Sequence, residues 1–170
     1  MHNFYVILHR LIKNGTATFF KGRVTSVDGA SAFVFASTAV LSHLRNAEQI
    51  HGDGTFATVP NMFYQMFTLH LVAFGKVCMC FSYMFNMFSK FNAFQAFPFA
   101  YVLMSDKSLS LYTAVMRKIV DTVEEEHPGD GFATRLLISD FEEAIIKSMG
   151  AAFPTARARG CWFHYGQVNF

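Results

Sequence analysis

Apolar positions along the chain change their spacing twice. Within residues 1–47, only the stretch 30–44 looks regular, because its apolar side chains recur near the 3.6-residue period of a helix. Glycines interrupt the sequence before it. We therefore predict an N-terminal segment over residues 1–47, part helical and part irregular, ahead of a domain over residues 48–170.

Three successive stretches after that segment are predicted to be strands. Residues 49–59 change to a strand pattern, and a Pro-Asn turn signal follows them. Residues 65–75 and 97–104 are two further apolar runs, rich in Phe, Leu and Val. Joined by short links, the three strands would form an antiparallel meander.

The spacing then returns to that of a helix over residues 108–127. This stretch carries one apolar face, formed by Leu111, Val115, Ile119 and Val123. Residues 135–138 follow as a short buried strand, and a last strand is expected near residues 158–163. The order β-β-β-α-β-α-β predicts an α/β fold with a mixed sheet, in which later strands are joined by helices.

Between the last two strands we expect a second helix, which begins after Asp140 and ends at Gly150. Its inner face would hold Phe141, Ala144, Ile145 and Met149.

Residues 77–95 do not fit this plan, because a tight turn would be enough to join the second and third strands. The segment holds five Phe, three Met and two of the three cysteines, but no acidic residue. One interpretation is a true insertion that forms a hydrophobic hairpin or helix. The other is a retained intron read in frame, since Val77-Cys78 and Phe94-Gln95 can be encoded by GTATGT and TTTCAG.

Composition narrows the class of protein. Of the 170 residues, 52% are hydrophobic and 15% are charged, which favours a folded domain over a disordered chain. The net charge of +2 does not by itself indicate binding to nucleic acid or to a membrane surface. We expect no signal peptide, because residues 1–11 show no basic region that leads into an apolar run and a cleavage site. We expect no membrane partner, because the longest apolar stretch, residues 77–100, contains several polar side chains.

Two acids stand out by their placement on the predicted strands. Asp53 lies between two glycines on the first strand, and Asp140 follows the fourth. If these strands are neighbours, both carboxylates can reach one divalent cation, and Mg²⁺ prefers carboxylate oxygens together with water and phosphate. Two ordinary alternatives stay open: Asp140 as a helix N-cap, and Asp53 as a turn or bulge residue.

An ordered set of short motifs connects these acids to a known family. The motifs are Asp53-Gly54-Thr55-Phe56, Phe97-Pro98-Phe99, Ser139-Asp140-Phe141-Glu142, Ala152-Phe153-Pro154 and Gly160-Cys161-Trp162-Phe163-His164. Together they resemble the transposase domain of Mutator-like elements, over residues 33–170 apart from 77–95. The resemblance implies a ribonuclease H-like fold, incomplete at its C-terminus, an acidic triad that binds Mg²⁺ or Mn²⁺, and a nuclear protein that cleaves and transfers the DNA ends of a transposon.

Carried over by resemblance, the first two acids of the triad are Asp53 and Asp140, as catalytic residues and metal ligands. The third acid, a Glu, is expected beyond the Cys-x-x-His element, and this chain does not reach that position. Glu142, Glu143 and residues 124–126 are candidates by residue type only, on predicted helix surfaces. Two acids would hold a second metal poorly, so we expect this polypeptide to be catalytically weak or inactive.

Further candidate residues lie around the two acids. Cys161 and His164 match the Cys-x-x-His element, whose spacing suits one edge of a zinc site, although a closed site needs four ligands. The alternative is a packed cysteine beside a hydrogen-bonded histidine. His51, Arg157 and Arg159 are candidate contacts for DNA phosphates.

Three interpretations of the whole chain stay open on the sequence. The first is a fragment of a Mutator-like DNA transposase, active when a downstream acid completes it. The second is a domesticated, non-catalytic protein that associates with DNA. The third is a decayed element, which the atypical segment 77–95 favours.

Overall fold

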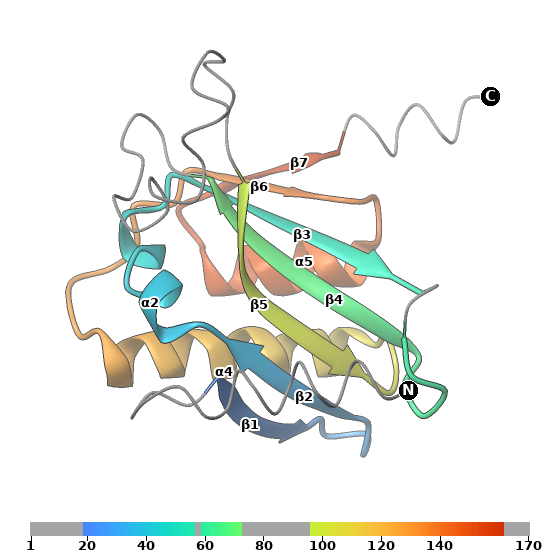
Figure 1. The fold of residues 1–170 in the computed structure, drawn as a ribbon. Helices are drawn as coiled ribbons and strands as arrows, with labels where there is room; N and C mark the ends of the chain where they lie inside the picture. The colour runs from blue at the N-terminus through green and yellow to red at the C-terminus, as the bar shows by residue number, and fades with distance from the viewer. Residues whose placement is uncertain (1–18, 57–58, 73–95, 162–170) are drawn as a thin grey trace, which may run out of the picture.

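The computed structural model describes residues 19–56, 59–72 and 96–161, which form a mixed sheet with helices on one face (Figure 1). The strands are β1 (Phe20–Thr25), β2 (Ser31–Ala36), β3 (Gln49–Thr55), β4 (Gln65–Val72), β5 (Ala96–Met104), β6 (Leu136–Ser139) and β7 (Arg157–Gly160). The helices are α2 (Thr38–Leu41), α4 (Leu109–Glu126) and α5 (Glu143–Ala152), with a 3-10 turn at Leu44–Asn46. The predicted α/β class with a mixed sheet is confirmed.

The strands lie in the order β1-β2-β5-β4-β3-β6-β7. From β3 onward the elements follow each other as predicted, β-β-β-α-β-α-β. β3, β4 and β5 are antiparallel neighbours, whereas β6 pairs with β3 in parallel and β7 with β6 in parallel. β3 is therefore the strand at which the sheet changes from antiparallel to parallel pairing.

The helix predicted over residues 30–44 is wrong. Its first half is strand β2, and only the short helix α2 follows. Ala32 and Val34 are completely buried on the helix-covered face, while Phe33 and Phe35 lie on the other face. Because both faces of β2 are apolar, the alternation typical of a strand is hidden and the spacing imitates a helix.

The stretch before β2 is also more regular than predicted. β1 pairs with β2, and the shift in their register falls between Phe20 and Gly22, where Gly22 takes a φ of 125°. Glycine adopts this conformation without the steric cost that a Cβ would add. Residues 20–36 therefore extend the sheet by two strands instead of forming an irregular segment.

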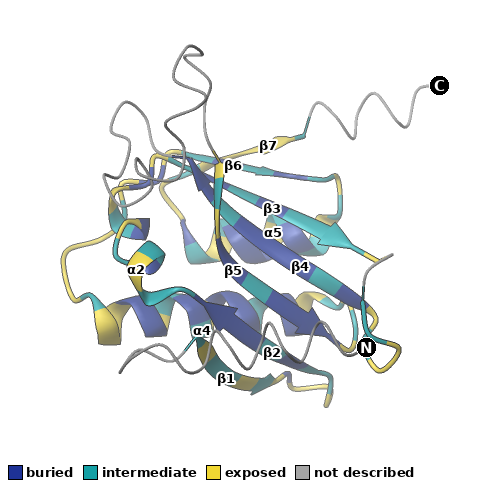
Figure 2. Cartoon of the chain, viewed as in Figure 1, coloured by how far each residue is buried: buried dark blue, intermediate teal, exposed yellow. Residues whose placement is uncertain are grey.

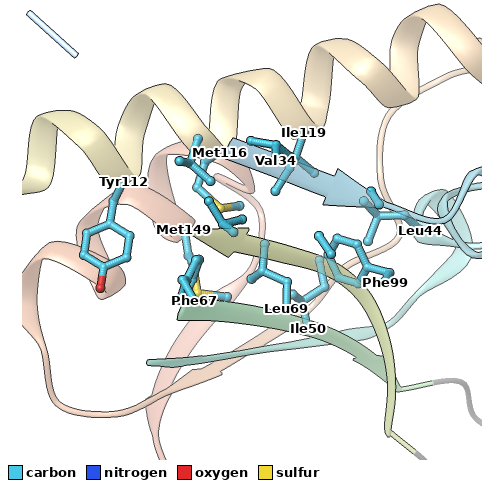
Figure 3. Close-up of a cluster of buried hydrophobic side chains, with 14 of the residues drawn as sticks. Val34, Leu44, Ile50, Phe67, Leu69, Phe99, Tyr112, Met116, Ile119 and Met149 are labelled. Atoms are coloured by element: carbon cyan, nitrogen blue, oxygen red, sulfur yellow. The ribbon is translucent and has the colours of Figure 1, made fainter. Parts of the chain in front are cut away.

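The core lies between the sheet and the helices α4 and α5 (Figures 2 and 3). α4 turns its predicted apolar face inward, and all four predicted side chains are buried. They meet side chains from the central strands, and α5 adds Met149. The fully buried members that the close-up labels include Val34, Leu44, Ile50, Phe67, Leu69, Tyr112, Met116 and Ile119.

The atypical segment 77–95 lies outside the described residues. The ends of the strands on either side of it are paired directly, Val72 with Ala96. A short turn would therefore be enough to connect β4 to β5, as the sequence suggested. Among the helices that the structure describes, none combines the length and the apolar character that crossing a bilayer requires.

Candidate functional site

Parallel pairing of β3 with β6 brings the two predicted acids to one end of the sheet. The register pairs His51 with Ile138 and Gly52 with Ser139. The next residue along each strand is an acid, Asp53 on β3 and Asp140 after β6. Neighbouring strands lie about 4.8 Å apart, and residues in register point to the same face, so the register puts the two aspartates on one face at neighbouring strand ends. We call this end of the sheet the acidic end.

Asp53 belongs to a regular strand and not to a turn or bulge. The pairing of β3 with β4 runs without a shift from Gln49 to Thr55 and sets Asp53 opposite Thr68. Its two glycine neighbours face the helix side, where space is short. A Cβ on Gly52 would lie 2.8 Å from the Met149 sulfur, and one on Gly54 would lie 3.2 Å from Gln65 Oε1. The glycines therefore let α5 and Gln65 pack closely beneath the strand that carries the acid.

Asp140 is not the N-cap of the second helix, as one alternative held. α5 begins at Glu143, and its N-cap is Glu142. The Asp140 side chain instead accepts a hydrogen bond from the backbone N–H of Glu142, with 3.3 Å between nitrogen and Oδ1. This bond leaves the half-buried carboxylate at the strand end, where it can still reach a ligand.

Two further expectations for this helix are wrong. Phe141 does not join the inner face but is 54% exposed, because it precedes the helix. The helix also continues past Gly150 and ends at Ala152. The inner positions Ile145 and Met149 are buried as predicted.

A buried polar chain lies behind the acids. Gln65 is completely buried, and its side-chain Nε2 donates a hydrogen bond of 2.5 Å to the hydroxyl of Tyr112 at the start of α4. Tyr112 also interacts with the carboxyl of Glu142. Among the described residues, Gln65 Oε1 and Glu142 Oε1 are buried side-chain atoms with no hydrogen-bond partner. Leaving buried polar atoms without a partner costs free energy. The set formed by Gln65, Tyr112 and Glu142 is a polar feature inside an otherwise apolar layer.

Burial governs the charge of Glu142. It raises the pKa of the Glu142 carboxyl, an effect that Lys107 opposes and the negative charge of Asp140 reinforces. Burial likewise raises the pKa of Tyr112.

Two histidines share the sheet face of Asp53. His51 and His70 are directly opposite each other on β3 and β4. Burial lowers the pKa of both imidazoles; the neighbouring His70 lowers that of His51 further, whereas Asp53 acts in the opposite direction on His70. Both rings are therefore mainly neutral at neutral pH, and His51 can offer a hydrogen bond to a phosphate but little charge.

The remaining predicted residues lie on or after β7. Arg157 and Arg159 are both exposed and pair in register with Leu136 and Ile138 of β6, on the sheet face of His51. Cys161 is a half-buried free thiol whose backbone N–H donates to Ser139 O at 2.6 Å. His164 lies outside the described residues. Within residues 19–56, 59–72 and 96–161, no group of three or more His, Cys, Asp or Glu side chains could hold a metal.

Sequence reasoning missed the side chains that gather around the acids. Gln65 and Tyr112 are remote in sequence, and only the packing of α4 on β4 joins them. Three exposed aromatic rings at the same end, Phe56, Tyr64 and Phe141, were equally invisible as a group. Phe56 and Phe141 belong to the same short motifs as the two acids, which was the available signal that they lie near the site. A motif does not reveal, however, whether a side chain is exposed.

Comparison with known proteins adds the family. Residues 49–167 match the family model described as MULE transposase domain. No curated protein and no solved structure matches the chain. The matched region covers well over half of the 170 residues and contains both aspartates, the helices α4 and α5 and the strands from β3 to β7. The chain therefore belongs to the MULE transposase family.

Proposed function

We propose that the acidic end binds a divalent cation through Asp53 and Asp140, and that the family's DNA chemistry takes place there. One observation carries the proposal: β3 and β6 are parallel neighbours, and in their register each strand has its acid at the equivalent position, one residue after the Gly52–Ser139 pair. From the sequence alone, the two acids could share a cation only if their strands were neighbours in the sheet. The mixed sheet, with three antiparallel strands followed by strands joined through helices, supports a ribonuclease H-like assignment.

The donor set fits Mg²⁺ or Mn²⁺ in kind. Hard cations of this type take oxygen ligands, often one or two carboxylates plus water and substrate phosphate. When bound, such a cation activates the attacking oxygen and stabilises the leaving oxygen in phosphodiester cleavage. Asp53 and Asp140 would hold the cation, and a further acidic ligand is expected by resemblance from sequence beyond these residues.

Residues on the same sheet face would orient the DNA backbone. Arg157 and Arg159 offer positive charge from the exposed strand β7. The neutral imidazole of His51 lies between them and β4 and can contribute a hydrogen bond. Their common sheet face supports a role for these side chains in binding DNA phosphates next to the acid pair.

Binding of Mn²⁺ tests the proposal without requiring catalysis. We expect the wild-type chain to bind Mn²⁺, measured by electron paramagnetic resonance of the free ion, and Asp53→Asn or Asp140→Asn to weaken binding at least about tenfold. The unfolding midpoint should change little, because each variant conserves side-chain volume. Asp121→Asn, on the exposed surface of α4, is the matched control and should bind Mn²⁺ like the wild type. Equal Mn²⁺ affinity in all four proteins would refute the site.

A second candidate is a DNA-associated protein without catalysis. It is favoured by the lack of any three-ligand group among the described residues. A cleavage assay on plasmid DNA with Mn²⁺, run on a longer form of the chain that supplies the third acid, separates the two candidates. Nicking that disappears in Asp53→Asn supports the enzyme, whereas DNA binding without nicking supports the second candidate.

A further inference from the structure

Two histidines form a cross-strand pair on the sheet face opposite helices α4 and α5. His51 of β3 and His70 of β4 lie directly opposite each other in an antiparallel pairing that runs without a shift. Gly52, the next residue on β3, faces the helix side, where a Cβ would meet the Met149 sulfur. Side chains alternate between the two faces of a strand, so His51 and His70 share the other face.

The two imidazole rings are near neighbours. Residues directly opposite in an antiparallel pair have their Cβ atoms about 4.5–5.5 Å apart. The rings also interact electrostatically, because the charge of His70 lowers the pKa of His51. Both side chains are half-buried, so solvent still reaches them. Their nitrogen atoms can therefore approach one small ligand from two strands.

Polar neighbours surround this pair. The side-chain amide of Gln49 lies 2.5 Å from His51 Nε2 and leaves Nδ1 as the ring nitrogen that can bind an ion. Asp53 interacts electrostatically with His70 from the next position on the same face of β3. A polar contact at the second ring nitrogen fixes the orientation of an imidazole, as it does for histidines that bind metals.

The donor atoms select the kind of ion. Imidazole nitrogen suits Zn²⁺, Cu²⁺ and Ni²⁺, whereas Mg²⁺ and Mn²⁺ favour carboxylate oxygen and water. Two imidazoles on facing strands can both reach a Zn–N distance of about 2.0–2.1 Å. Since the described part of the chain offers no group of three or more ligating side chains, water would complete the coordination. This is an open site and not a closed structural one.

We propose that His51 and His70 together bind one divalent transition-metal ion of the zinc type, between strands β3 and β4. The site differs from the proposed Mg²⁺ or Mn²⁺ site at the acidic end, because its ligands are nitrogen atoms and it includes neither aspartate. The proposal therefore does not depend on the proposed function. Each imidazole alone binds zinc weakly, and the pairing holds the second ligand at a high effective concentration once the first has bound.

Nuclear magnetic resonance of the imidazole ¹⁵N nuclei tests the site on the wild-type chain, titrated with Zn²⁺. We expect the rings of His51 and His70 to shift together, with one common midpoint. His51→Gln should weaken the zinc affinity reported by the His70 ring at least about tenfold, and His70→Gln should do the same to His51. His43→Gln, at an exposed position before β3, is the matched control and should leave the common midpoint unchanged.

Zinc binding elsewhere is separated by a further variant. Cys161→Ser removes the thiol of the Cys-x-x-His element and should leave the shifts of His51 and His70 as they are in the wild type. A shift in only one of the two rings, or two rings with different midpoints, would overturn the proposal. So would a His70 midpoint that does not change in His51→Gln, or a His43 ring that responds at the same zinc concentration.

Asp53→Asn distinguishes this site from the acid pair. The variant should lose Mn²⁺ affinity but keep the paired shifts of His51 and His70 with Zn²⁺. If Mn²⁺ binding does not change in Asp53→Asn and the paired shifts persist, the histidine site stands and the acid pair falls. If the paired shifts disappear in Asp53→Asn, the zinc ion belongs to the acid pair and the histidine site falls.

Discussion

The helix-covered face of the sheet and the acidic end are built from the same strands but in opposite ways. On the covered face, Leu69, Val34 and Ile119 are fully buried in one apolar cluster. At the acidic end, the same strands finish in half-buried carboxylates, exposed rings and a buried polar chain. The comparison indicates that stability comes from the middle of the strands and that the proposed chemistry depends on where they end.

Removing a side chain from the covered face should have the largest effect on stability. Leu69→Ala in β4 leaves a cavity in the core, and we expect the free energy of unfolding to fall by about 2–5 kcal/mol. Urea unfolding measures it. Leu109→Ala, at an exposed position of α4, is the control and should change stability by less than about 0.5 kcal/mol. Equal losses in both variants would contradict the division between core and end.

The buried hydrogen bond between Gln65 and Tyr112 should contribute less to stability than the apolar core does. Tyr112→Phe removes the hydroxyl that accepts from Gln65 Nε2 and should cost about 1–3 kcal/mol, because the Gln65 amide is completely buried. Replacing both partners, as Tyr112→Phe with Gln65→Met, should recover much of that loss, since no buried polar group is then left unpaired. A double variant that is less stable than Tyr112→Phe alone would show that Gln65 and Tyr112 do not contribute to stability as a pair.

The two histidines should make the smallest contribution, which depends on pH. Folding lowers the pKa of His51 and His70, so below about pH 6.5 the unfolded chain binds more protons than the folded one. Their contribution is complete above pH 6.5 and is lost as the pH falls through the lowered pKa values. Both rings are half exposed, which limits the effect to a few tenths of a kcal/mol.

Chemical denaturation between about pH 7.5 and pH 5.5 measures this difference. His51→Gln with His70→Gln should flatten the dependence relative to the wild type. Glu142 has a raised pKa and acts in the opposite direction, since its contribution is lost as the pH rises. Because Glu142 is present in both proteins, their difference isolates the histidines. Identical curves would show that neither imidazole changes its pKa on folding.

Local sequence was enough to predict an element that has one buried face and one exposed face. Helix α4 has one apolar face against the sheet and one polar face, so the 3.6-residue period predicts both its limits and its core side chains. β2 was mistaken for a helix because β1 and β5 flank it and both of its faces are apolar. When both faces of a strand are buried, its sequence no longer alternates between apolar and polar residues. Local spacing then cannot distinguish such a strand from a helix.

The sequence by itself determined the order of elements from β3 to β7, the family and the choice of two aspartates as the residues to examine. Only the tertiary structure decided that Asp53 and Asp140 lie at the same end of neighbouring strands, because strand pairing between β3 and β6 joins positions that are far apart along the chain. It also decided that Phe141 is exposed and that Gln65 reaches Tyr112. Spacing along a chain records which face a residue takes on its own element, whereas contacts between elements arise only when the sheet assembles.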